Sequence, residues 1–237
     1  MKFRICSETC KGTERNFHRD NIILKYSASE KRNALMLVLC EELCKNESFS
    51  ICAEIIETFS SWYNTEMERI IENENLFDVT SAWKRMIRKL NSRYFSRAME
   101  NEGTAGATFT GIFILDDNYC IVHIGDAVIY QITKQVRQLT ADETNKEKNA
   151  CFFNQCIGGS DEINPKIIYG RTCAGIYCAG TSGFRNTVTE SDLLEFFPLS
   201  EIDTEAEMQE KGKRLMDILH RRRSNVDMSA VLMKLCR

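Results

Sequence analysis

Four acidic residues and one arginine stand beside short motifs that can carry chemistry. Arg15 precedes Asp20 in a polar segment, Asp126 follows a glycine, and Glu41 and Asp227 lie at the ends of apolar runs. An arginine binds phosphate through its guanidinium group, and carboxylates bind hard divalent cations such as Mg²⁺ and Mn²⁺. Each residue also has a structural interpretation, because Arg15 can pair with a surface acid and Asp126 can shape a turn between strands. The chemistry therefore depends on the elements that position these residues.

The apolar pattern predicts a chain of mixed strands and helices. Short β-compatible runs bounded by polar turns predict strands at residues 22–26, 35–39, 111–115, 119–124, 127–133, 136–139, 175–179 and 229–235. Apolar residues at spacings of three and four predict helices at residues 49–62, 80–94, 189–196 and 204–220. This order is typical of an α+β domain in which two sheets pack together with helices outside.

The composition predicts one globular domain over residues 1–237. The chain is 43% hydrophobic and 27% charged, which suits a single continuous core. Its formal net charge of -3 provides no basic field for nucleic acid or anionic lipid. No apolar run approaches the roughly 20 residues of a membrane span, and no signal-peptide pattern is present, so we expect a cytoplasmic protein. The 11 cysteines are odd in number and mostly flanked by apolar residues, which favours buried thiols over disulfides or a zinc site.

Seven short motifs occur in an order that resembles the PP2C-type serine/threonine protein phosphatases in their compact bacterial form. The motifs are Gly12-x-x-Arg15 ahead of Asp20-Asn21, Gly106-Ala107-Thr108, Ile124-Gly125-Asp126, Gln138-Leu139-Thr140, Cys156-Ile157-Gly158-Gly159, Ser182-Gly183-Phe184-Arg185 and Asp227-Met228-Ser229. No single motif is specific, but together they cover nearly the whole chain. The resemblance implies an α+β fold, a β-sandwich of two antiparallel sheets flanked by helix pairs, with a two-metal site at one end.

In such a family the metals supply the nucleophile. Hydrolysis of a phosphomonoester at neutral pH needs a hydroxide-like oxygen, and bridging divalent cations lower the pKa of bound water from about 16 towards about 7. That change corresponds to on the order of 10 kcal/mol. Two adjacent Mg²⁺ or Mn²⁺ ions need several carboxylates to offset their charge. The resemblance also places Arg15 at the phosphate-binding position.

Several implied metal-ligand positions depart from the family pattern. The alignment places Arg19, Cys40, Ser182 and Val226 at positions that are acidic in the family, whereas Asp20 and Asp126 are retained. Cys40 and Val226 are poor ligands for hard cations, and Arg19 adds a positive charge. We therefore expect a degenerate metal site without catalytic residues and without a bound cofactor.

Two functional hypotheses follow. The first is a pseudophosphatase, a PP2C-like signalling protein that binds a protein partner or phosphoprotein without catalysis. The alternative is an active Mn²⁺- or Mg²⁺-dependent phosphatase with a rearranged metal site built from Asp20, Glu41, Asp126 and Asp227. Using Glu41 and Asp227 as metal ligands requires a shift of the alignment by one residue at each position. Neighbouring strand residues point to opposite faces, which argues against these two ligands unless a bulge intervenes. Cysteine-based phosphatase chemistry through Cys40 or Cys178 is disfavoured, because neither cysteine has an arginine five residues on.

Overall fold

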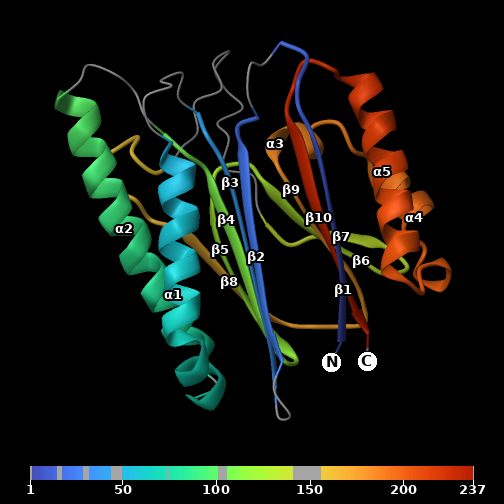
Figure 1. The fold of residues 1–237 in the computed structure, drawn as a ribbon, viewed down its shortest axis with the longest axis horizontal. Helices are drawn as coiled ribbons and strands as arrows, with labels where there is room; N and C mark the ends of the chain where they lie inside the picture. Colours follow the sequence, from blue (N-terminus) through green and yellow to red (C-terminus); the bar gives the residue numbers. More distant parts are fainter. Residues whose placement is uncertain are drawn as a thin grey trace. The chain divides into compact units, whose positions relative to one another are not determined.

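The computed structural model describes residues 2–14, 18–28, 32–43, 50–73, 75–100, 106–140 and 156–236. These residues form two compact units, each built around an antiparallel sheet of five strands. Unit 1 comprises Met1–Asp20, Ala127–Ala141 and Cys173–Arg237, and unit 2 comprises Asn21–Asp126 and Asp142–Thr172. Each sheet packs its own helices against one face (Figure 1).

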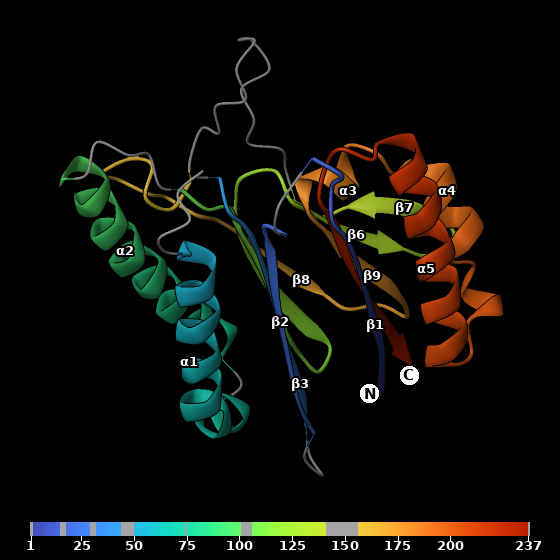
Figure 2. The same ribbon diagram turned by 45° about the horizontal axis from the view of Figure 1, so that its top comes forward.

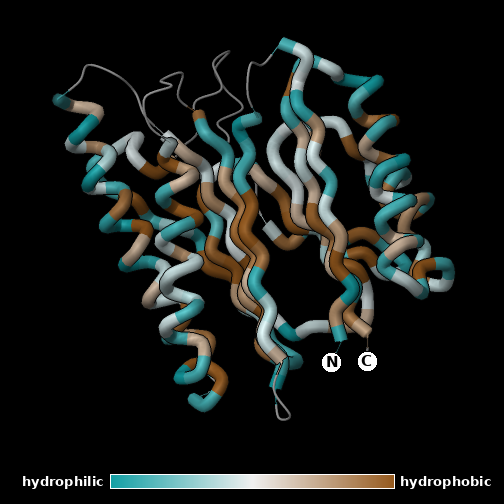
Figure 3. The backbone as a smooth tube through the Cα atoms, viewed as in Figure 1, coloured by the Kyte–Doolittle hydropathy of each residue, from teal (hydrophilic) through white to brown (hydrophobic). Residues whose placement is uncertain are grey.

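The sheet of unit 2 has the strand order β2-β3-β4-β5-β8. Its elements are β2 (Asp20–Ala28), β3 (Asn33–Glu41), β4 (Phe109–Leu115), β5 (Asn118–Ile124), β8 (Lys166–Arg171), α1 (Ile51–Asn73) and α2 (Leu76–Glu100). Both helices lie side by side against the same face of this sheet, as the turned view in Figure 2 also shows. Hydrophobic residues run along β3, β4 and β5 (Figure 3), because these central strands are buried on both faces.

Aromatic side chains fill the core between the helices and the sheet of unit 2. Phe59 of α1 and Trp83 of α2 are fully buried, and their rings meet edge to face at 5.3 Å between centroids. Phe109 of β4 packs against Phe59 at 4.8 Å. Gly111 leaves the space that the Trp83 indole occupies, since a Cβ there would lie 2.4 Å from the ring. The apolar spacing of three and four residues thus forms the core face of both helices.

The sheet of unit 1 has the strand order β1-β10-β9-β6-β7, so the first and last strands of the chain pair. Its elements are β1 (Lys2–Cys10), β6 (Val128–Ile132), β7 (Val136–Gln138), β9 (Gly175–Gly180), β10 (Met228–Cys236), α3 (Ser182–Arg185), α4 (Glu190–Phe196), a 3₁₀ turn η1 (Leu199–Glu201) and α5 (Glu205–Arg222). Antiparallel pairing of β1 with β10 runs from Lys2 opposite Cys236 to Cys10 opposite Met228. This full-length pairing brings both ends of the chain into one sheet.

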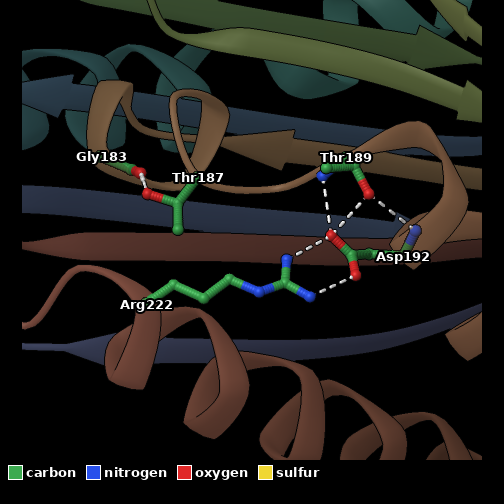
Figure 4. A network of polar contacts seen from close by, with 5 residues as sticks. All are labelled: Gly183, Thr187, Thr189, Asp192 and Arg222. Carbon is green, nitrogen blue, oxygen red and sulfur yellow. Dashed lines mark hydrogen bonds and ion pairs between the residues drawn. The ribbon is translucent and has the colours of Figure 1, made fainter.

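An ion pair joins α4 to the end of α5 in unit 1 (Figure 4). The guanidinium of Arg222 donates to both carboxylate oxygens of Asp192, at 2.6 and 2.9 Å. The same carboxylate completes the N-terminal cap of α4, because it accepts hydrogen bonds from the N–H and hydroxyl of Thr189. Arg222 therefore has a structural partner at a helix C-terminus, where a cation is also favoured by the helix dipole.

The predicted α+β architecture is confirmed, and so are the predicted strands and helices, with shifted ends. α1 and α2 are longer than predicted, whereas β1, β8 and the four-residue α3 were missed. Within the described residues, no helix is long and apolar enough to cross a bilayer. The expectation of one domain over residues 1–237 stays a prediction.

Candidate functional site

In unit 1 the carboxylate of Asp227 holds both ends of the segment between β1 and β2. Its Oδ1 accepts a hydrogen bond from the N–H of Gly12 at 2.8 Å, and its Oδ2 accepts one from the N–H of Arg19 at 3.1 Å. The side chain is buried, and Thr13 adds a backbone bond to Ser224 at 2.8 Å beside it. Hydrogen bonds from two N–H groups satisfy a buried carboxylate well, so Asp227 clamps this segment to the start of β10.

Asp20, the first residue of β2, lies next to this clamp with both carboxylate oxygens buried. Within the described part of the chain neither oxygen accepts a hydrogen bond of ordinary length, nor does the Ser229 hydroxyl make one. Burial raises the pKa of Asp20, nearby Ser229, His18 and Thr181 oppose that rise, and Asp227 adds to it. The Thr181 hydroxyl accepts a bond from the Ser229 N–H at 3.0 Å, which leaves its own proton to donate. Buried oxygens of this kind suit a proton, a water molecule or a cation.

Ser182 begins the short helix α3, which packs closely against β10. A Cβ on the next residue, Gly183, would lie 2.0 Å from the carbonyl oxygen of Asp227, so only glycine fits there. Ser182 therefore stands at a fixed position near the clamp, but its hydroxyl carries no charge to offset a cation. Val226 is partly buried and packs against the apolar core that α4 and α5 form with their sheet.

In unit 2 the side chain of Cys40 lies on the helix-facing side of the sheet. Met36, Val38 and Cys40 share this face and belong to the core formed with α1 and α2. The Cys40 thiol is fully buried and is directed towards the carbonyl oxygens of Asn21, at 3.6 Å, and Cys52, at 3.9 Å. A thiol in an apolar core is a poor ligand for Mg²⁺ or Mn²⁺.

Glu41 points to the face opposite the helices, because successive strand residues alternate. Its backbone is joined to Thr108, whose N–H donates to the Glu41 carbonyl at 3.0 Å and whose hydroxyl accepts from the Glu41 N–H at 3.2 Å. Thr108 also packs against Gly125, which has a φ of 103° and no room for a Cβ. Asp126 follows and is buried. Glu41 and Asp126 thus lie at the same end of the sheet, since β3 and β5 are both antiparallel to β4.

Among the residues that the structure describes, the candidate carboxylates of each unit form at most a pair. Among the described residues no three His, Cys, Asp or Glu side chains are grouped as metal ligands. In unit 1 the pair is Asp20 and Asp227, and the second of these already accepts two backbone N–H groups. Two adjacent divalent cations need several carboxylates, so this donor set fits a proton or a single cation better than a metal pair.

No protein-family model and no curated protein sequence matches the chain. Solved structures match it over almost its whole length. The S. agalactiae serine/threonine phosphatase has a TM-score of 0.80 and 16% identity, and the match covers 99% of this chain and 100% of the phosphatase chain. The phosphatase Stp1 from Staphylococcus aureus has a TM-score of 0.77 and 17% identity, with coverage of 100% and 96%. The catalytic domain of the phosphatase PstP, in complex with two manganese ions, has a TM-score of 0.67 and 19% identity, with coverage of 99% for both chains.

The chain has the fold of the PP2C-type serine/threonine phosphatases. The predicted pair of antiparallel sheets with accompanying helices is therefore confirmed. At 16% to 19% identity the likeness establishes the PP2C fold and leaves the activity to the residues of this chain. The two manganese ions belong to PstP.

Within the PP2C fold the predicted site residues are divided between the two units. Those of unit 1 lie around one end of β10 and the start of β2: Arg19, Asp20, Ser182, Val226 and Asp227. Those of unit 2 lie at the ends of β3 and β5: Cys40, Glu41 and Asp126. Arg15, the predicted phosphate-binding position, lies outside the described residues.

Two threonines that organise these strand ends were assigned no role from the sequence. Thr181 pairs with Ser229 in unit 1, and Thr108 joins Glu41 to the turn at Gly125 in unit 2. Thr181 directly precedes the motif that begins at Ser182, and Thr108 is the last residue of the motif that begins at Gly106. That position was the available signal, because hydroxyls at strand ends satisfy backbone groups that the ladder leaves open.

Proposed function

We propose that this protein is a PP2C-like pseudophosphatase that acts in signalling by binding a protein partner or phosphoprotein without hydrolysing phosphate. The observation that carries the proposal is the state of Asp227. Both of its carboxylate oxygens accept backbone N–H groups, from Gly12 and Arg19. A carboxylate in this position orders a loop by itself and needs no metal ion to do so.

The residues at the other degenerate positions support the same proposal. Cys40 places a thiol in the apolar core of unit 2, and the partly buried Val226 packs against the apolar core of unit 1. Ser182 contributes a neutral hydroxyl where a charge is needed. Arg19 is positively charged, whereas the PP2C family has an acidic residue at the matching position. We therefore expect neither Mn²⁺ nor Mg²⁺ as a resident cofactor and no catalytic residue in this chain.

A phosphatase assay tests the proposal. The substrates are p-nitrophenyl phosphate and a phosphothreonine peptide, each with excess Mn²⁺ or Mg²⁺, and the PstP catalytic domain serves as the positive control. We expect the same background rate for the wild-type protein and for its Asp126→Asn variant. Clear metal-dependent turnover that the Asp126→Asn substitution abolishes would contradict the proposal.

The second candidate is an active Mn²⁺- or Mg²⁺-dependent phosphatase that uses the remaining carboxylates. Two observations favour it: the oxygens of Asp20 are buried without ordinary hydrogen bonds, and Glu41 points away from the helices. If a metal bound to this chain, it would supply a hydroxide-like nucleophile at neutral pH. Asp20 would then act as a ligand, and Asp20→Asn would abolish both metal binding and turnover.

We also propose a cytoplasmic location. The cysteines described by the structure are free thiols, which fits a reducing compartment. Fractionation of cells that produce the tagged protein tests this, and recovery in a membrane or secreted fraction would contradict it.

A further inference from the structure

A pocket of about 490 Å³ lies in unit 2 at the end of the sheet opposite Glu41. The turn from α1 to α2, the tip of the β4–β5 hairpin and the end of β8 surround it, at the lower end of this unit in Figure 1. We name it the β8 pocket; it is lined mainly by Arg32, Leu76, Phe77, Asp116, Tyr169 and Arg171. The nine-residue strand β3 separates it from Glu41 by roughly 25–30 Å.

Two exposed aromatic side chains form walls of the β8 pocket. Phe77 is 67% exposed and Tyr169 is 50% exposed, although large aromatic residues usually bury most of their surface. The Tyr169 hydroxyl is hydrogen-bonded to the Thr80 hydroxyl at 2.7 Å, so its ring is held in place. Gly170 next to it leaves room for the ring of Tyr119, because a Cβ there would lie 2.3 Å from that ring. The pocket thus presents two aromatic rings to solvent among polar and charged neighbours, and a hydrogen bond holds one of them, Tyr169.

The charge at the mouth of the β8 pocket is positive. Arg32 forms an ion pair with Asp116 at 2.7 Å, so those two charges offset each other. Arg171 is exposed and has no ion-pair partner within the described residues. It lies two residues after Tyr169 on the same side of β8. A ligand that enters beside Tyr169 therefore meets an unneutralised guanidinium group, which favours a carboxylate.

The strand that carries these two side chains is an edge strand. β8 pairs with β5 from Lys166 opposite His123 to Arg171 opposite Asn118, and it is the last strand in the order of its sheet. Within the described residues no strand pairs with its outer edge. An exposed edge offers unpaired backbone N–H and C=O groups to an extended peptide, which is a common mode of peptide recognition.

We propose that the edge of β8 and the β8 pocket form a docking site for an extended acidic segment of a partner protein. The segment adds a strand to β8 and places an apolar side chain between Phe77 and Tyr169. A neighbouring Asp or Glu of the segment binds Arg171. This site goes beyond the proposed function and does not depend on it, because it lies a strand's length from Glu41 and involves no phosphate or metal.

A fluorescence-anisotropy titration tests the docking site. The probe is a fluorescein-labelled octapeptide of alternating Val and Thr with a central Phe flanked on both sides by Glu, in buffer with EDTA and without phosphate. We expect saturable binding with a Kd on the order of 10–500 µM, because the contact is a single short strand with one apolar side chain. Replacing both Glu by Gln in the probe should weaken binding about fivefold or more, and a central Pro should abolish it.

Protein variants locate the binding. Arg171→Gln should weaken binding about fivefold, and Tyr169→Ser about tenfold, whereas Arg137→Gln on the exposed strand β7 should leave it unchanged. Urea unfolding of each variant checks that the fold is retained. If the Tyr169→Ser variant does not fold, hydrogen exchange of the wild-type protein is measured instead, and the bound probe should slow the exchange of the backbone amides of β8.

Several outcomes would overturn the docking site. These are no saturable binding up to about millimolar protein, equal affinity for the Glu and Gln probes, equal loss in Arg137→Gln, or binding of a phosphorylated probe only. Sedimentation that shows self-association through β8, abolished by Tyr169→Ser, would assign the edge to a second copy of this chain and also overturn it. Because the probe carries no phosphate and no metal is present, such a failure leaves the pseudophosphatase proposal untouched.

Discussion

Replacement of Asp227 by Asn separates a structural carboxylate from a metal ligand. In the wild-type protein its two oxygens accept N–H groups from Gly12, at 2.8 Å, and Arg19, at 3.1 Å. An Asn keeps one acceptor but turns an NH₂ group towards the other N–H, so a donor faces a donor in a buried place. A bond to a charged acceptor contributes about 1.5–3 kcal/mol, and relief of repulsion with Asp20 returns a smaller amount.

We therefore expect Asp227→Asn to lower the free energy of unfolding by about 2 kcal/mol, and Asp227→Ala by about 3–4 kcal/mol because both acceptors are lost. Urea unfolding in EDTA measures this, and the Asn variant should lower the midpoint by about 1 M. The matched control is Asp217→Asn on the exposed face of α5 in the same unit, which should change the stability by less than about 0.5 kcal/mol.

A metal ligand would behave in the opposite way. Neutralising one of two neighbouring carboxylates would leave the metal-free protein as stable as the wild type or more stable, since their repulsion is gone. Added Mn²⁺ would then stabilise the wild type alone, because only a folded protein with an intact site gains from the ion. That pair of results would refute the structural role of Asp227.

Further predictions concern unit 1 and the whole chain. The bond from Arg222 lowers the pKa of Asp192 from 3.8 to about 2, so its contribution is full above pH 3.8 and is lost as the pH falls towards 2. The full difference corresponds to about 2.4 kcal/mol, and solvent screening of the half-exposed arginine reduces this to about 1–2 kcal/mol. Asp192→Asn should therefore lower the free energy of unfolding by that amount at pH 7 and by almost nothing near pH 2. The control Glu210→Gln, in an exposed ion pair on α5, should lower it by less than about 0.5 kcal/mol at pH 7. An equal loss of stability in Asp192→Asn at both pH values would contradict the role of the Arg222 bond. Gly183→Ala should cost about 2–4 kcal/mol in thermal unfolding, because its Cβ would lie 2.0 Å from the Asp227 carbonyl oxygen, and an unchanged melting temperature would contradict this close approach. If the chain is one domain, calorimetry and circular dichroism should report one coincident unfolding transition, and two separate transitions would show that the units unfold independently.

The long elements were predictable from the sequence because their periodicity repeats many times. Phe59 and Trp83 lie on stripes of three and four residues that continue over several turns, and such stripes must face a core. β1 and β8 were missed because each is an edge strand that mixes exposed charged residues with apolar ones. α3 has only four residues, which is too short for any helical period to be recognised.

The strands that carry the candidate site residues were predictable from the sequence, but the contacts of these residues were not. Asp227 was considered as a metal ligand, whereas its hydrogen-bond partners Gly12 and Arg19 lie 215 and 208 residues away in the chain. The side of the sheet that Cys40 faces depends on which face α1 and α2 cover, and the strand pattern alone does not decide this. Only tertiary packing supplies both pieces of information.

Calorimetric titration with Mn²⁺ tests most directly whether this chain, which has a PP2C fold, has lost the ability to bind the catalytic metals. The wild-type protein is titrated to millimolar Mn²⁺ beside the PstP catalytic domain, whose structure holds two manganese ions. We predict saturable binding for PstP and only heat of dilution for this protein. Saturable binding to the wild type that Asp20→Asn removes, together with phosphatase turnover under the same conditions, would contradict the loss of the metals.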